Sequence, residues 1–352
     1  MSLAARLDGP LGHALAPLGW LYDAAARLRV AAYRRGWKAS LRPPIPTLSI
    51  GNLAAGGTGK TPLLLEALRW LEEHHASVGV LSRGYGGDEG LMLRARYPEV
   101  ALVEDADRRR GLRTLLSGGK PEVLLLDDGF QHLKLQRDCD VVLLDATRPF
   151  GRCFPAGLFR ETAQALRRAD LVVLSRAELV DAGVREAIWR QVAAARGESA
   201  TAPVEGGVHA RRLLHLADRS VEDLEAWRGR EVGLAAGIGN PASFRALVEG
   251  LGMVVRAEHR LADHHPWTPE LVARLQAGEV DGWKGPWLVT EKDAVKIAPG
   301  SSGLFELQVD WRWLRGEDVF HDKLLHLHLP ARAARIEPLW AAHDPHGRGG
   351  ST

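Results

Sequence analysis

Residues 49–68, SIGNLAAGGTGKTPLLLEAL, constrain the fold more than any other stretch of this chain. They join an apolar strand, a glycine-rich turn, the tripeptide Gly59-Lys60-Thr61 and a helical pattern of leucines. In a strand-loop-helix unit of this kind, small residues let successive backbone amides point inward at phosphate oxygens. The stretch therefore predicts a phosphate-binding loop at the carboxyl end of a parallel strand.

The loop departs from the strict motif at one position, because Ala54 stands where glycine is usual. That position is the exit of the strand, where a methyl group is the smallest possible intrusion, so we still expect a nucleotide site. Lys60 would neutralise the β- and γ-phosphates, and the Thr61 hydroxyl would ligate Mg²⁺. The predicted nucleotide-binding residues are Ala54, Ala55, Gly56, Gly57, Thr58, Gly59, Lys60 and Thr61.

A phosphate-binding loop needs an acidic partner at the end of another strand, and residues 122–132, EVLLLDDGFQH, provide one. Asp127 and Asp128 follow a buried apolar run, which is where carboxylates hold Mg²⁺ in proteins of this type. Paired acids at a strand end also form turns. The loop and the acids support one another, which favours a metal role, and the residues leave open which aspartate touches the metal.

Strand and helix patterns alternate along most of the chain, which predicts an α/β fold with a mainly parallel sheet. A length of 352 residues exceeds one ordinary core and favours two domains. We expect a three-layer P-loop NTPase domain, RecA-like or Rossmann-like, and a smaller second α/β domain. The expected boundaries are an N-terminal helix in 1–42, the P-loop domain in 43–205, the second domain in 206–340 and a frayed tail in 341–352.

The N-terminal segment predicts an amphipathic basic helix. Apolar residues recur at spacings of three and four, and residues 1–42 carry seven cationic side chains against two aspartates. Such a helix suits an anionic lipid surface, and a helix packed on its own domain with a solvated basic face is the alternative. The apolar stripe consists of Leu18, Leu21, Ala25, Leu28 and Ala32.

Composition excludes several classes of protein. A net charge of +2 and the lack of a basic stripe beyond the N-terminal segment argue against nucleic-acid binding. The two cysteines, Cys139 and Cys153, offer no zinc spacing or disulfide framework and are expected to be core thiols. No export leader or spanning apolar stretch is evident, so we expect a protein on the cytoplasmic side.

Six motifs occur in a fixed order: GNLAAGGTGKTP, SRGYGG, DDGFQH, PAGLFRE, ADHH and TEKDA. In this combination the chain resembles the tetraacyldisaccharide 4'-kinase family of Gram-negative bacteria over nearly its whole length. The resemblance implies transfer of the ATP γ-phosphate, with Mg²⁺, to the 4'-hydroxyl of tetraacyldisaccharide 1-phosphate in lipid A biosynthesis. It also implies a peripheral enzyme on the cytoplasmic face of the inner membrane; no nucleic-acid or protein partner is expected.

The resemblance also implies roles for particular residues. Asp88, in Gly87-Asp88-Glu89, matches the catalytic aspartate of the family, although Gly90 stands where the family has proline. His264 matches the histidine that pairs with this aspartate, and Glu161 would complete the magnesium environment. A carboxylate can accept the proton of the acceptor hydroxyl if a neighbouring group holds it in place. The expected catalytic residues are Asp88, His264 and Lys60, and the expected metal ligands are Thr61, Asp127, Asp128 and Glu161.

The residues by themselves leave some alternatives open. Asp105 and Asp107 compete with Asp88 as the base, and Arg83 and Arg160 are candidate contacts for phosphate or sugar. A regulatory GTPase is the rival from another class, but Ser175-Arg176-Ala177-Glu178 does not match a guanine-reading motif, which favours adenine. A nucleic-acid-binding ATPase is a second rival. The role of TEKDA does not follow from the sequence.

Overall fold

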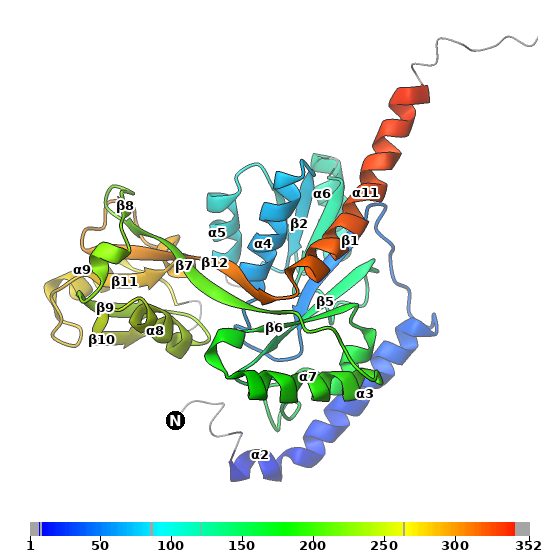
Figure 1. Cartoon of the computed structure of the whole chain (residues 1–352), viewed down its shortest axis with the longest axis horizontal. Helices are drawn as coiled ribbons and strands as arrows, with labels where there is room; N and C mark the ends of the chain where they lie inside the picture. The colour runs from blue at the N-terminus through cyan, green and yellow to red at the C-terminus, as the bar shows by residue number, and fades with distance from the viewer. Residues whose placement is uncertain (1–6, 8, 85–86, 120, 263–264, 342–352) are drawn as a thin grey trace, which may run out of the picture.

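The computed structural model describes residues 7, 9–84, 87–119, 121–262 and 265–341. Its described strands form one large, mostly parallel sheet in the order β10-β9-β11-β12-β7-β6-β5-β1-β4-β2-β3, with the short β8 (Val221–Glu222) paired to β7. Helices cover the sheet, as Figure 1 shows, so the protein has the mixed α/β fold that the sequence predicts. His264 lies outside the described residues.

The first unit contains the six parallel strands at one end of the sheet. Each of its four central strands has five or more residues and is buried along almost its whole length, as expected for a sheet covered on both faces. The strands are β1 (Thr47–Asn52), β2 (Val78–Ser82), β3 (Ala101–Glu104), β4 (Val123–Asp127), β5 (Cys139–Asp145) and β6 (Leu171–Ser175); the helices are α4 (Lys60–Glu73), α5 (Asp88–Arg96), α6 (Arg108–Gly118) and α7 (Ala182–Arg196).

The second unit is a smaller α/β arrangement at the other end of the sheet (Figure 1). Its strands are mutually parallel, and Trp227 and Trp287 are among its fully buried side chains. It comprises β9 (Glu231–Ala236), β10 (Val254–Arg260), β11 (Trp287–Thr290), α8 (Pro241–Gly250), α9 (Pro269–Ala277) and α10 (Glu291–Ala294).

Two long strands connect the units, β7 (Glu205–His215) and β12 (Leu304–Arg315), and they pair antiparallel along almost their whole length. The domain boundary expected between residues 205 and 206 falls within β7, which begins at Glu205. In β7 the side chains at 208–212 alternate between half-buried and exposed, so no apolar run reveals the strand. The sheet is therefore continuous across the expected domain boundary.

The C-terminal helix α11 (Glu317–Ala341) returns to the first unit. Phe320, Leu324 and Leu327 pack in the same core as Leu63 and Leu71 of α4. Expected membership of residues 317–340 in the second domain is thereby corrected, because the apolar face of this helix is buried against α4 and not against β9 or β11. Its later turns project away from the body (Figure 1). The tail that is expected to be frayed, residues 341–352, lies outside the described residues from residue 342 onward.

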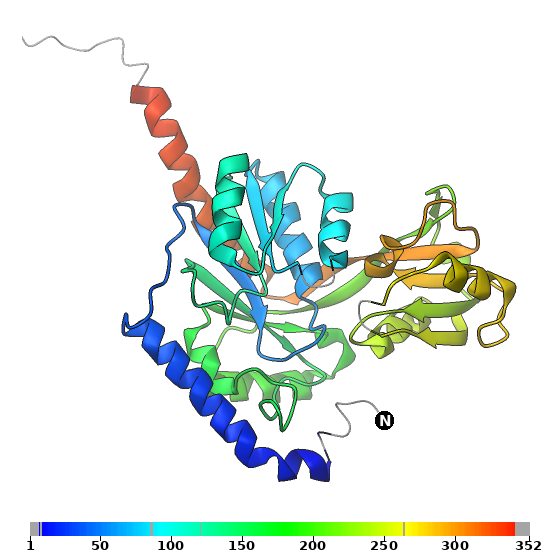
Figure 2. The ribbon, with the colours of Figure 1, turned by 180° about the vertical axis from the view of Figure 1, so that it is seen from behind.

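At the N-terminus, α2 (Pro10–Ala14) and α3 (Ala16–Arg34) lie along the side of the first unit, as Figure 2 shows from behind. Gly19 and Asp23 are the buried residues of α3, and a Cβ at position 19 would lie only 3.0 Å from the Ala156 side chain. The leucines of the predicted stripe instead face outward, and Leu21 is 68% exposed. None of the described helices combines the length and apolar character needed to cross a bilayer.

Candidate active site

A cavity of about 480 Å³ lies where the two units meet. The first unit contributes the loop after β1 and the carboxyl ends of β2 and β4, which is where ligands bind in open α/β sheets. The second unit contributes the loop and first turns of α8 and the start of α10. The lining residues used below are Gly56, Gly57, Thr58, Gly59, Lys60, Thr61, Arg83, Glu89, Asp127, Asp128, Arg160, Arg176 and Lys292.

The glycine-rich loop has the backbone that a phosphate cradle needs. Gly56 and Gly59 have φ angles of +111° and +87°, a region that side chains other than glycine rarely adopt. Hydrogen bonds brace the turn from both sides: the Asn52 amide donates to the Thr58 hydroxyl at 2.7 Å, and the Ser175 hydroxyl donates to the Thr58 carbonyl at 2.7 Å. The loop is therefore held in shape by β1 and by the end of β6.

Ala54 and Ala55 do not line the cavity, unlike the six residues that follow them. The Ala55 amide donates to the Leu158 carbonyl at 2.7 Å, and Ala54 forms a bridge with Phe159 while its side chain packs on an apolar cluster of the first unit. The expectation that residues 54–61 form one binding segment is corrected here. Backbone pairing with residues 158–160 turns the first two residues away, so a methyl group at position 54 intrudes on nothing.

Lys60 and Asp128 face one another across the cavity. The Lys60 ammonium lies 3.4 Å from the Asp128 carboxylate, and the Arg160 guanidinium donates to both oxygens of that carboxylate at 2.8 and 3.0 Å. Burial alone would raise the pKa of Asp128, but the two cations outweigh burial and hold it below its ordinary value. The Asp128 carboxylate therefore stays ionised at neutral pH.

The pKa of Asp127 is shifted in the opposite direction from that of Asp128. Burial, together with the nearby Glu89 carboxylate, raises the pKa of Asp127 to about 7, and Lys60 opposes this shift only in part. Thr61, Asp127 and Asp128 all line the same cavity and present a hydroxyl and two carboxylates, a donor set that suits Mg²⁺. The predicted residues therefore fit a magnesium ion, which would supply a cationic partner for the Asp127 carboxylate.

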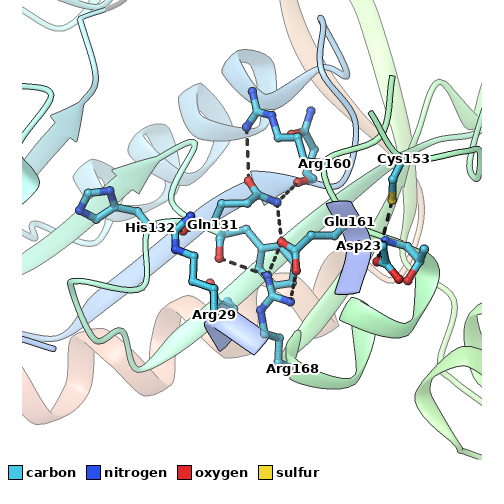
Figure 3. Close-up of polar contacts among 12 residues, drawn as sticks. Asp23, Arg29, Gln131, His132, Cys153, Arg160, Glu161 and Arg168 are labelled. Atoms are coloured by element: carbon cyan, nitrogen blue, oxygen red, sulfur yellow. Dashed lines mark hydrogen bonds and ion pairs between the residues drawn. The ribbon is translucent and has the colours of Figure 1, made fainter. Parts of the chain in front are cut away.

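Glu161 lies apart from this donor set and does not line the cavity. Its carboxylate accepts two hydrogen bonds from Arg168, at 2.6 and 2.7 Å, and one from Gln131 at 3.1 Å (Figure 3). Gln131 in turn accepts from Arg160 at 3.3 Å. The role of Glu161 at the metal stays a prediction: here Arg168 donates to both of its oxygens, and its link to the cavity runs through Gln131 and Arg160.

Asp88 is the first residue of α5 and its side chain is completely buried. Its carboxylate lies 3.4 Å from the Lys296 ammonium and 3.8 Å from that of Lys292, and Asp88 itself is not among the residues that line the cavity. Glu89 lines the cavity instead. The alternative bases are engaged elsewhere: Asp105 pairs with Arg110, and Asp107 caps the N-terminus of α6.

The comparisons with known proteins agree with one another. The family model for tetraacyldisaccharide-1-phosphate 4'-kinase, LpxK, matches residues 11–87 and 86–328. The chain belongs to this kinase family. A tetraacyldisaccharide 4'-kinase of Anaeromyxobacter dehalogenans is 40% identical over 92% of this chain and 91% of its own, and one of Pseudomonas entomophila is 34% identical over 87% of each.

A solved structure shares the fold of this family member. It is the crystal structure of the "apo" form of LpxK from Aquifex aeolicus in complex with ATP, with a TM-score of 0.70 and 28% identity over 90% of this chain and 98% of that one. The predicted activity, phosphorylation of tetraacyldisaccharide 1-phosphate at its 4'-position in lipid A biosynthesis, is thereby confirmed at the level of the family.

Two arginines near the cavity, Arg176 and Arg108, have structural roles that the sequence did not predict. The Arg176 guanidinium donates to the Gly57 carbonyl at 2.7 Å and pairs with Asp145, so Ser175-Arg176 braces the loop in place of a base-reading motif. Arg108 is buried and donates to the Asp127 carbonyl at 3.0 Å. Only the position of Ser175-Arg176 after a strand gave a signal in the sequence. Arg83 is exposed and lines the cavity, and its role as a substrate contact stays a prediction.

Proposed function

We propose that this chain transfers the γ-phosphate of ATP to the 4'-hydroxyl of tetraacyldisaccharide 1-phosphate, with Mg²⁺, at the cytoplasmic face of the inner membrane. The observation that carries the proposal is one cavity that joins a braced glycine-rich loop, Lys60 and two strand-end aspartates. The family and the ATP complex of its Aquifex aeolicus relative support ATP as the donor. The P-loop NTPase type of the first unit is part of the proposal.

At the nucleotide end, backbone amides of Gly56–Gly59 would receive phosphate oxygens, and Lys60 would exchange Asp128 for the β- and γ-phosphates. Arg160 would then remain on Asp128 and hold that carboxylate in place. Thr61, Asp127 and Asp128 would hold Mg²⁺, which neutralises the charge that develops on the phosphates. Glu161 would steady Arg160 through Gln131.

At the acceptor end, Asp88 would accept the proton of the 4'-hydroxyl, and Arg83 would contact phosphate or sugar oxygens. Because the Asp88 side chain is completely buried here, its use requires α5 or α10 to shift when substrate binds. The pairing of His264 with Asp88 stays a prediction. Glu89, at the cavity wall, would add negative charge beside the bound Mg²⁺.

Asp88→Asn is expected to lower kcat by roughly 10²-fold or more, as for the loss of a general base. The variant keeps the volume and the Glu89 amide contact of Asp88, so ATP binding should change little. Steady-state kinetics with the lipid acceptor would measure the rate. Asp105→Asn serves as a matched control, and an unchanged rate for Asp88→Asn together with a large loss for Asp105→Asn would assign the base to Asp105.

The reaction itself is tested by incubating the chain with radiolabelled ATP and tetraacyldisaccharide 1-phosphate in mixed micelles. The expected product carries a new phosphate on the distal sugar. Replacing ATP with GTP should reduce turnover strongly. Label that appears only as inorganic phosphate, or a preference for GTP, would contradict the proposal.

The outward face of α3 supports the proposed membrane association. Leu18, Trp20, Leu21 and Leu28 are each more than half exposed on a segment that carries an excess of cations. Because α3 contacts the first unit through Gly19 and Asp23, the apolar face remains available for a lipid surface. We infer that α3 lies in the interface and brings the acceptor, whose acyl chains stay in the bilayer, to the cavity.

The triple substitution Trp20→Ser, Leu21→Ser and Leu28→Ser should abolish binding to vesicles that contain anionic lipid, because it removes the exposed apolar area. Co-sedimentation would measure binding, and titration with a nonhydrolysable ATP analogue should show an intact nucleotide site. A matched triple serine variant at Val184, Leu314 and Val221, which are exposed apolar residues elsewhere, should bind vesicles like wild type. Equal vesicle binding by both triple variants would refute the role of α3.

A further inference from the structure

The TEKDA motif, residues 290–294, has no role in the proposed function. It forms a buried hydrogen-bond network at the start of α10. The Asp293 side chain is completely buried and accepts hydrogen bonds from the Gly237 amide at 3.0 Å, the Trp267 indole at 2.9 Å and the Thr290 hydroxyl at 2.7 Å. Each of these partners belongs to the second unit. Asp293 is therefore fixed in the second unit.

Lys296 connects this hydrogen-bond network to the first unit. Its ammonium lies 3.0 Å from the Asp293 carboxylate and 3.4 Å from the Asp88 carboxylate, and its side chain is only 13% exposed. A second lysine, Lys292 of α10, has its ammonium 3.8 Å from the carboxylates of both Asp88 and Glu89. One buried ammonium is thus shared between a carboxylate of each unit.

Buried carboxylates and ammonium groups lie next to one another in this cluster. Asp88 and Asp293 are completely buried, and ammonium groups lie near both carboxylates. Removing one member of a buried charged cluster leaves its partner unpaired at a large cost, so the cluster fixes the side chains it contains. Asp88 also accepts a hydrogen bond from the Glu89 amide at 3.1 Å, which orients the second of its carboxylate oxygens.

The two lysines differ in their relation to the cavity. Lys292 lines it, whereas Lys296 does not and instead lies with its neighbours at a separate groove on the second unit. An effect of Lys296 on phosphoryl transfer would therefore be indirect, and in the first unit its ammonium lies beside the Asp88 carboxylate. This difference makes Lys296 the informative residue to replace.

We propose that Lys296 is a positioning residue for Asp88: the second unit supplies the cation that sets the place and orientation of the base in the first unit. The proposal rests on the proposed function, in which Asp88 accepts the acceptor proton. Because Lys296 is fixed to Asp293, a change in the angle between the units moves the cation that holds Asp88. The TEKDA motif thus couples the arrangement of the two units to the base.

The test compares kcat, KM for ATP and the affinity for a nonhydrolysable ATP analogue in the full-length protein. Lys296→Gln should lower kcat about 10-fold to 10²-fold, as for a misplaced reacting group, and leave the KM for ATP and the analogue affinity unchanged. Lys296→Arg should recover most of the rate because it restores the cation. Lys284→Gln, which removes an exposed lysine of the second unit, should behave like wild type.

A double-mutant cycle separates positioning from a general structural effect. In an Asp88→Asn background, Lys296→Gln should change kcat by less than about twofold, because the group that it positions is already disabled. Melting temperatures verify that each variant is folded, and Lys296→Met, which retains the apolar stem, is measured alongside in case Lys296→Gln unfolds.

Two outcomes would overturn this inference alone. One is a wild-type kcat in Lys296→Gln and Lys296→Met while Asp88→Asn is impaired. The other is an equal loss of rate from Lys296→Gln in both backgrounds, which would indicate a structural role. A wild-type rate in Asp88→Asn would instead refute the proposed role of Asp88, on which the inference depends.

Discussion

Lys60→Ala is expected to abolish phosphoryl transfer, with a loss of at least about 10²- to 10³-fold in kcat, the range for removing one preorganised contact to developing charge. Lys60 is the cation at the start of α4, at the mouth of the braced loop, and its ammonium lies 3.4 Å from the Asp128 carboxylate. Arriving phosphates would replace that carboxylate as its partner. The measurement is label transfer from ATP to the lipid acceptor.

Ala54→Gly is the matched control for this experiment. It restores the strict motif at a position that the structure places outside the cavity, so activity should stay close to wild type. Near-normal turnover in Lys60→Ala would exclude the loop as the donor site. A large gain in Ala54→Gly would show that the methyl group does obstruct the phosphates.

Asp127→Asn is expected to remove activity and at the same time to stabilise the protein without ligand. The amide cannot supply the negative charge that Mg²⁺ requires, so turnover should fall about 10²-fold or more. Without a cation, however, the ionised Asp127 is buried beside Glu89, which is why its pKa is raised to about 7. A neutral side chain of the same shape removes that unfavourable charge, as is common where function and stability conflict.

The pH dependence gives this prediction a definite sign. Between the ordinary aspartate pKa of about 3.9 and the folded value, the folded state binds more protons than the unfolded state, so the free energy of unfolding decreases as pH rises. The loss is complete above about pH 7. With a chelator present to remove metal ions, the free energy of unfolding of Asp127→Asn should therefore exceed that of wild type by about 2–4 kcal/mol at pH 8. This difference should shrink toward pH 4.

Asp128→Asn is the control, because replacing Asp128 is expected to change the stability in the opposite direction from replacing Asp127. Lys60 and Arg160 hold the pKa of Asp128 below its ordinary value, so its ionised form contributes stability at neutral pH that is lost as pH falls through the folded pKa. Its replacement should lower the melting temperature at pH 8. Urea unfolding at pH 5 and pH 8 would measure both variants, and equal shifts for the two would contradict the assignment of distinct environments.

Local patterns predicted most elements of both units and the residues at the strand ends. The elements that these patterns missed or blurred have physical reasons for it. The strand β7 and its partner β12 have partly exposed, polar faces, so they lack the apolar runs that mark β4 or β6. The helix α5 begins after Gly87, which has a left-handed backbone, and its short sequence DEGLMLRAR includes a glycine and few apolar residues, which conceals it.

The sequence by itself determined the glycine-rich loop after a strand, the paired aspartates and the kinase family, because these depend on residue type and short spacing. Only the tertiary structure decided which neighbours share a surface. It turned Ala54 away by pairing its strand exit with residues 158–160, bound Glu161 to Arg168, and joined Asp88 to Lys296 across 208 positions of chain. Burial and charge partners come from segments far apart in the sequence, and no local pattern records them.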